Sequence, residues 1–74
     1  MLSVTSFRIA STRGANRIPG SGEATFSDGR TYGWFRHPLT GGILFSGARQ
    51  MPGGWDRFSF HAPKRAAALE AALS

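Results

Sequence analysis

The dipeptide Asp28-Gly29 constrains the fold of this chain more than any other feature. It lies between two β-prone runs, residues 23–27 and residues 30–36. Asp-Gly is a preferred dipeptide for the two-residue type I′ turn, whose twist matches that of a β-hairpin. The sequence therefore predicts a hairpin over residues 23–36, with a positive φ at both turn residues.

This turn also predicts which side chains share a face of the hairpin. A two-residue loop pairs Thr25 with Tyr32 and Glu23 with Trp34, and side chains alternate along each strand. One predicted face carries Ala24, Phe26, Thr31, Gly33 and Phe35. The other carries Glu23, Thr25, Ser27, Arg30, Tyr32, Trp34 and Arg36. The first face, extended by Leu44, is the more apolar, so we assign it to the core.

The flanking sequence predicts further strands joined by loops. Residues 2–10 read as a strand, with a bulge where the apolar positions change phase between Val4 and Phe7. Residues 43–46 and 55–61 read as two more strands, and a four-residue loop before the first of these would put Phe45 beside Trp34. Residues 12–22 and 47–54 are rich in Gly and are predicted to be flexible loops.

The chain ends in a predicted helix over residues 63–73. Pro63 fits the first helical position, where its missing N–H costs nothing. A helix this short is marginal in water, so we expect Leu69 and Leu73 to be buried against Phe26, Phe35 or Phe58.

Size and composition complete the predicted architecture. The chain has 74 residues, ten of them glycine, and no cysteine, which excludes disulfides and thiolate metal sites. No apolar run approaches the roughly 20 residues that a membrane-spanning helix needs. We predict one α+β domain over residues 1–74, a small curved antiparallel sheet of four to five strands, partly barrel-like, with one C-terminal helix. The lack of cysteine fits a cytoplasmic protein.

The charge of the chain indicates the class of its partner. The chain contains nine Lys and Arg residues and four acidic residues, which gives a net charge of +5. Eight of the nine cations are Arg. Arg grips phosphate and guanine with a planar fork and stacks on aromatic rings. A basic, Arg-rich domain is typical of proteins that bind nucleic acid or an acidic protein. A surplus of positive charge also keeps a small protein soluble, so charge alone leaves both interpretations open.

Three clusters are candidate nucleic-acid-binding sites, and the third is the loop pair at residues 12–22 and 47–54, whose Arg13, Arg17 and Arg49 could hold phosphate. The first is the strip formed by one strand, which we expect to be exposed so that its aromatic rings stack on bases and its arginines contact phosphate. The second is the helix start, where cations beside free backbone N–H groups could hold an anion. The predicted residues are Arg30, Tyr32, Trp34, Arg36 and Arg57 for the first, with Trp55 nearby, and Lys64 and Arg65 for the second. The alternatives are a buried Trp34 with arginines at the rim, and solvated cations at the helix start.

One run of residues resembles a known kind of DNA-binding module. Residues 32–41, followed by a strand and a C-terminal helix, resemble the three-stranded sheet-plus-helix modules of phage integrases and of a class of plant transcription factors. The likeness covers about half of the chain and rests on an aromatic hairpin with a Pro-x-Thr-Gly turn. The chain departs from that pattern in a strand before the hairpin and another before the helix. The resemblance implies no role for any individual residue of this chain.

Catalysis has little support in the sequence. The two histidines and four acids show no metal-ligand spacing, and no nucleophile motif or phosphate-binding glycine loop occurs. We therefore predict a non-enzymatic module that binds DNA or RNA, with no cofactor and no membrane partner. The alternative is a protein-interaction protein, such as a phage- or plasmid-type inhibitor, that docks the same strip on a protein. Pairing of edge strands into a homodimer is a further option.

Overall fold

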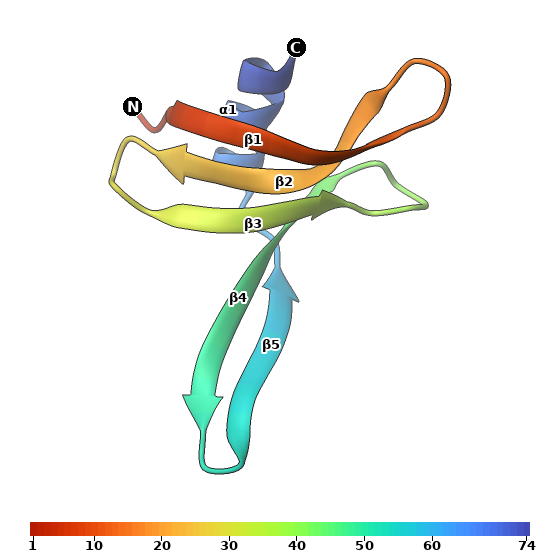
Figure 1. Ribbon diagram of the computed structural model, residues 1–74. Coiled ribbons are helices and arrows are strands. Elements are labelled where there is room, and N and C mark those ends of the chain that lie inside the picture. Colours follow the sequence, from red (N-terminus) through yellow and green to blue (C-terminus); the bar gives the residue numbers. More distant parts are fainter.

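The computed structural model describes residues 1–74 and shows an antiparallel five-stranded sheet with one helix on one of its faces (Figure 1). Neighbouring strands follow the order of the chain. The elements are β1 (Val4–Arg13), β2 (Ile18–Phe26), β3 (Thr31–Arg36), β4 (Ile43–Met51), β5 (Gly54–Phe60) and α1 (Pro63–Leu73). The predicted α+β fold class is confirmed, although the sheet stays open and does not close into a barrel. The helix is too short to cross a membrane.

The turn between β2 and β3 has one residue more than predicted. Phe26 and Arg30 close a three-residue loop, because the Phe26 N–H donates to the Arg30 carbonyl at 2.9 Å. Gly29 is the only loop residue with a positive φ, +85°. The predicted hairpin is therefore confirmed, but the prediction of a two-residue type I′ turn is wrong. Three-residue loops of this kind end in a left-handed residue, which glycine adopts without a steric penalty.

That extra residue reverses the predicted faces of β3. Ala24 now pairs with Tyr32 and Gly22 with Trp34. Because side chains alternate with a period of two, a shift of one residue moves a whole strand's side chains to the other face. Trp34 consequently shares a face with Phe26 and is only 2% exposed. The assignment of the core to the face with Phe35 is wrong for this reason.

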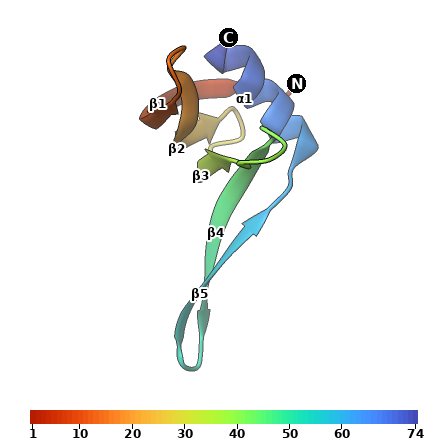
Figure 2. The same ribbon diagram turned by 90° about the vertical axis from the view of Figure 1, so that its right-hand side faces the viewer.

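The helix covers the face that carries Trp34 (Figure 2). Leu69 has no exposed surface and lies in one apolar cluster with Phe26, which confirms the predicted docking, and Leu73 packs at its edge. Trp34 pairs with Phe45, so the predicted four-residue loop between β3 and β4 is confirmed as well. The buried residues of the cluster are Ala24, Phe26, Trp34, Ile43, Phe45 and Leu69.

The two glycine-rich segments predicted as loops are mostly strand. β1 runs on to Arg13 and β2 begins at Ile18, so that a four-residue turn is all that joins them. β4 likewise runs on to Met51, and only Pro52 and Gly53 separate it from β5. The predicted bulge near the start of β1 is confirmed by a shift in register between Val4 and Ser6.

Beyond Ser46, β4 and β5 pair only with each other. β3 makes its last pair with β4 at Ser46, while the β4–β5 pairing continues to Met51 and Gly54. We call this two-stranded extension, residues 47–58, the arm; it projects from the rest of the sheet in both views (Figures 1 and 2).

The base of the arm explains one of its glycines. The Phe58 ring lies across Gly47, where an added Cβ would stand 2.6 Å from the ring. The Arg49 guanidinium covers the same ring at 5.5 Å. Glycine inside a strand often marks such a close approach, so Gly47 belongs to the ribbon and does not mark a loop.

Candidate functional site

The predicted aromatic strip on β3 is part of the core. Trp34 is buried, and the ring of Tyr32 packs edge-on against Phe45 at 6.0 Å and against Phe60 at 5.5 Å. The buried Trp34 ring offers no open face on which a base could stack, and the half-buried Tyr32 ring already has Arg65 over it at 5.1 Å. The prediction of an exposed strip is therefore wrong for Trp34 and its neighbours Tyr32 and Arg36, and the one-residue difference in the turn is the reason.

Arg36, at the end of the same strip, holds three parts of the fold together. Its guanidinium donates to the Pro19 carbonyl at 2.7 Å and to the Gly41 carbonyl at 3.0 Å. It also donates to the Glu70 carboxylate at 2.7 Å, which ties the sheet to the helix. Only 13% of the Arg36 side chain is exposed. These contacts leave it little capacity for a ligand.

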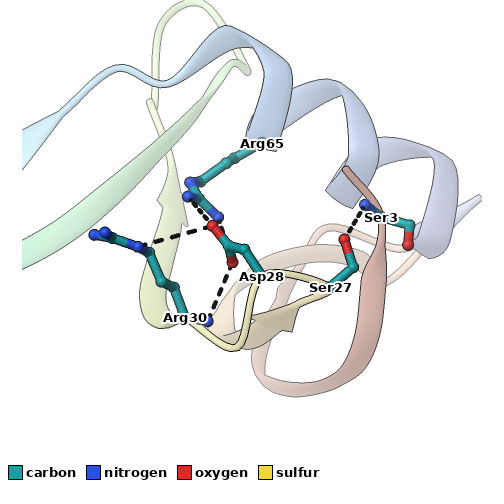
Figure 3. Close-up of polar contacts among 5 residues, drawn as sticks. All are labelled: Ser3, Ser27, Asp28, Arg30 and Arg65. Atoms are coloured by element: carbon teal, nitrogen blue, oxygen red, sulfur yellow. Dashed lines mark hydrogen bonds and ion pairs between the residues drawn. The ribbon is translucent and has the colours of Figure 1, made fainter. Parts of the chain in front are cut away.

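Arg65, at the predicted helix-start site, is engaged in the same way (Figure 3). Its guanidinium makes two hydrogen bonds to the Asp28 carboxylate, at 2.6 and 3.3 Å. It also lies 4.9 Å from the ring centre of Phe26 and 5.1 Å from that of Tyr32. The hydrogen bonds from Arg65 are the main reason that the pKa of Asp28 falls to about 2, and they raise the pKa of Arg65 in turn. Arg65 thus locks the helix to the β2–β3 turn.

Two further predicted cations remain accessible. Arg30 is exposed beside that turn, with its Nε 3.8 Å from the Asp28 carboxylate. Lys64 is exposed at the start of the helix and has no acidic partner. The first turn of the helix contains no acid, and no side chain caps its N-terminus. Both residues lie on the side of the sheet that the helix covers.

All four acids of the chain are already paired with arginine. Glu23 pairs with Arg8, Asp28 with Arg65 and Arg30, Asp56 with Arg49, and Glu70 with Arg36. Four cations therefore have no acidic partner, namely Arg13, Arg17, Arg57 and Lys64. The net charge of +5 resides largely in these four side chains. Arg57 is the one among them that lies on the arm.

The sheet face opposite the helix has a different character from the buried one. We call it the open face; the strand register assigns to it Ser6, Arg8, Glu23, Thr25, Thr31, Phe35, Leu44, Ser46, Ala48, Gln50, Trp55, Arg57 and Ser59. The hydroxyls of Thr25 and Thr31 lie 2.9 Å apart, as neighbours on one face should. Its only acid is Glu23, which Arg8 holds at 3.2 Å. Hydroxyl, amide and guanidinium groups are those that contact phosphate and sugar.

The open face is hollowed where the arm leaves the rest of the sheet. A shallow depression of about 770 Å³ lies there, with Phe35 on one side and Arg57 on the other. Ser46 and Ser59, which pair across β4 and β5, form part of its floor. Arg57 is thus the only one of the seven predicted binding residues that the fold brings to the open face.

Sequence reasoning missed the most exposed aromatic residue of the chain. Trp55 is 68% exposed near the end of the arm, and Met51 and Phe58 are 45% and 41% exposed. The sequence places Met51 in a loop and ranks Trp55 behind Trp34, and it offers Phe58 as a core partner of the helix, which its exposure shows to be wrong. The usable signal was Pro52-Gly53, because a turn dipeptide between two β-prone runs favours a hairpin.

Comparison of the chain with protein-family models, with curated proteins and with solved structures found no match. No group of three or more His, Asp or Glu side chains is placed to hold a metal ion. The open face itself presents hydrogen-bond donors, hydroxyls and one exposed indole ring.

Proposed function

We propose that this chain is a non-enzymatic nucleic-acid-binding module that uses the open face and the arm. One observation carries the proposal. The face left uncovered by the helix joins an arginine without an acidic partner, Arg57, to an exposed indole, Trp55, and its only carboxylate is already neutralised by Arg8. Such a face attracts phosphate without an opposing charge.

Each part of the surface has a role in this proposal. Arg57 contacts phosphate, and the serine and threonine hydroxyls of the open face contact phosphate and sugar oxygens. Trp55 contacts base edges in a duplex, or stacks on the bases of a single strand, where stacking contributes about 1–3 kcal/mol per base. The net charge of +5 speeds association with a polyanion.

A binding titration tests the proposal. We expect the chain to bind labelled single- and double-stranded DNA and RNA measured by fluorescence anisotropy at low salt, and affinity to fall steeply as salt rises. Arg57→Ala should weaken binding and reduce the slope of log K against log salt by about one unit. Trp55→Ala should cost about 1–3 kcal/mol of affinity with little change in that slope.

Lys64→Ala is the matched control, because it removes the same charge from the helix side. It should change affinity less than Arg57→Ala does. Equal losses in the two variants would mean that charge acts diffusely and that the open face is not the binding surface. Failure of the wild-type chain to bind any of the four probes at low salt would end the nucleic-acid proposal.

A protein partner is the second candidate, and β1 is the feature that favours it. β1 is an edge strand that pairs only with β2, and its Phe7 and Ile9 are 45% and 42% exposed. Such an edge can accept a strand from another protein, including a second copy of this chain. Binding of that kind depends weakly on salt, whereas nucleic-acid binding depends on it strongly, so the same titration separates the two.

A further inference from the structure

We infer that the arm enters the major groove of B-form duplex DNA. This inference rests on the proposed function and narrows it to one nucleic acid and one groove. Four features of the arm carry it, namely its reach, its thickness, the placement of its arginines and the character of its tip.

The dimensions of the arm fit that groove. Residues 47–51 of β4 lie beyond the last pair with β3, and at about 3.4 Å per residue they reach about 17 Å. The major groove is about 8.5 Å deep and 12 Å wide, so the arm can reach its floor. A ribbon with side chains on both faces is about 10 Å thick, which exceeds the roughly 6 Å width of the minor groove.

The two arginines of the arm point to opposite faces of the ribbon. Arg57 pairs with Ala48 on the open face, and the next rung of the ladder pairs Arg49 with Asp56 on the other. Inside a groove, each arginine would face the phosphates of a different wall. A single nucleic-acid strand, or a flat protein surface, lying on one face of the ribbon would contact only one of the two arginines.

The ion pair between Arg49 and Asp56 does not prevent this contact. The Arg49 side chain is 65% exposed and the Asp56 side chain 45% exposed, with 3.1 Å between their charged atoms. Exposed pairs of this kind contribute little, so Arg49 can exchange the carboxylate for a phosphate. Asp56 nevertheless faces the same wall, and its removal should therefore strengthen binding.

The tip of the arm is uncharged and suits the groove floor. The residues from Gln50 to Trp55 carry no charge, and both Met51 and Trp55 are exposed. Gln50, which pairs with Trp55, can make two hydrogen bonds to adenine, and apolar side chains can contact the thymine methyl group. The major groove of an RNA duplex is too narrow for side chains to read, so the inference excludes double-stranded RNA as the preferred ligand.

The first experiment compares four probes of one sequence, about two helical turns long. These are duplex DNA, duplex RNA and the two DNA single strands, titrated by anisotropy at low salt. We expect duplex DNA to bind at least about tenfold more tightly than the others. Bulky glucosyl groups on cytosine C5, which fill the major groove, should abolish that preference, while a minor-groove ligand such as netropsin should leave it unchanged.

The second experiment uses variants of the arm. Arg49→Ala and Arg57→Ala should each lower the salt slope for duplex DNA by about one unit, and Asp56→Asn should raise the affinity several-fold. Equal or tighter binding to RNA or single strands, displacement by netropsin, or insensitivity to glucosylation would overturn the inference while leaving nucleic-acid binding intact. Loss of binding to every probe would instead refute the proposed function itself.

Discussion

The two hairpins β2–β3 and β4–β5 use similar residues for different purposes. Each has an arginine over aromatic rings, close to the turn in β2–β3 and at the base of the arm in β4–β5. In β2–β3 the arginine is Arg65 from the helix, and the rings of Phe26 and Tyr32 lie beneath it inside the core. In the arm the arginine is Arg49, which covers a Phe58 ring that stays 41% exposed.

The difference between them lies in what covers each hairpin. The helix seals one face of β2–β3 and holds its turn through Asp28, whereas no element of the chain packs on the arm beyond its base. Arg and aromatic residues are therefore no guide to function by themselves. Their role depends on register and on the position of the helix, which decide whether a ring meets other side chains or solvent.

Replacing the two tryptophans tests this comparison with the largest expected effect. Trp34→Ala should cost about 3–5 kcal/mol of stability, because a buried ring is lost and a cavity remains. Trp55→Ala should change stability by no more than about 0.5 kcal/mol, as exposed sites usually do. Urea denaturation followed by circular dichroism measures both.

Trp34→Phe serves as the control for the buried site. The Trp34 indole N–H is buried and has no hydrogen-bond partner, so its removal should cost much less than truncation to alanine. A large loss of stability in Trp55→Ala, or a small one in Trp34→Ala, would contradict the division of the molecule into a sealed hairpin and a free arm.

A second substitution examines the base of the arm. Gly47→Ala would place a Cβ 2.6 Å from the Phe58 ring, so the ring must shift, which disturbs its contacts with Arg49 and Phe60. We expect a loss of about 1–3 kcal/mol by thermal denaturation. In a Phe58→Ala background the same substitution should cost almost nothing, because nothing remains to clash with. Additive losses would mean that the ring does not explain the glycine.

The same two hairpins show which parts of the fold could be predicted from the sequence and which could not. The β pattern, the hairpin at Asp28-Gly29, the docking of Leu69 and the bulge in β1 all follow from local rules of propensity and periodicity. The faces of β3 could not be predicted, because Asp-Gly serves both two-residue and three-residue loops, and one residue reverses every side chain. The contact between Arg65 and Asp28 joins residues 37 positions apart, which no local rule anticipates.

The location of the candidate site was mispredicted for the same reason, because local rules do not fix register or strand length. Arg57 was predicted because it is a cation on a strand, and it does lie on the open face. Trp55 ranks behind Trp34 in the sequence-based prediction because the strip on β3 is expected to be exposed, and the glycines at positions 47, 53 and 54 indicate a loop in place of the arm. In fact Gly47 lies under a ring and Gly53 forms half of a two-residue turn, so two of the three glycines serve the hairpin.

The smallest expected effect is a dependence of stability on pH that arises from Asp28 at the turn of the sealed hairpin. The pKa of Asp28 is about 2 in the folded chain, below its ordinary value of 3.8, mainly because Arg65 donates hydrogen bonds to it. A lowered pKa means that the carboxylate stabilises the fold above about pH 4 and that this contribution disappears as the pH falls through about 2.

Asp28→Asn isolates this contribution, since the amide oxygen can still accept the Arg30 N–H that Asp28 accepts at 3.1 Å. Its difference in unfolding free energy from the wild type should be constant from neutral pH to about pH 4 and should then shrink toward zero. In an Arg65→Gln background the same substitution should show a much weaker dependence on pH, because the charged donor to Asp28 is gone. If Asp28→Asn follows the same pH profile with and without Arg65, Asp28 and Arg65 do not form the lock that holds the helix to the β2–β3 turn.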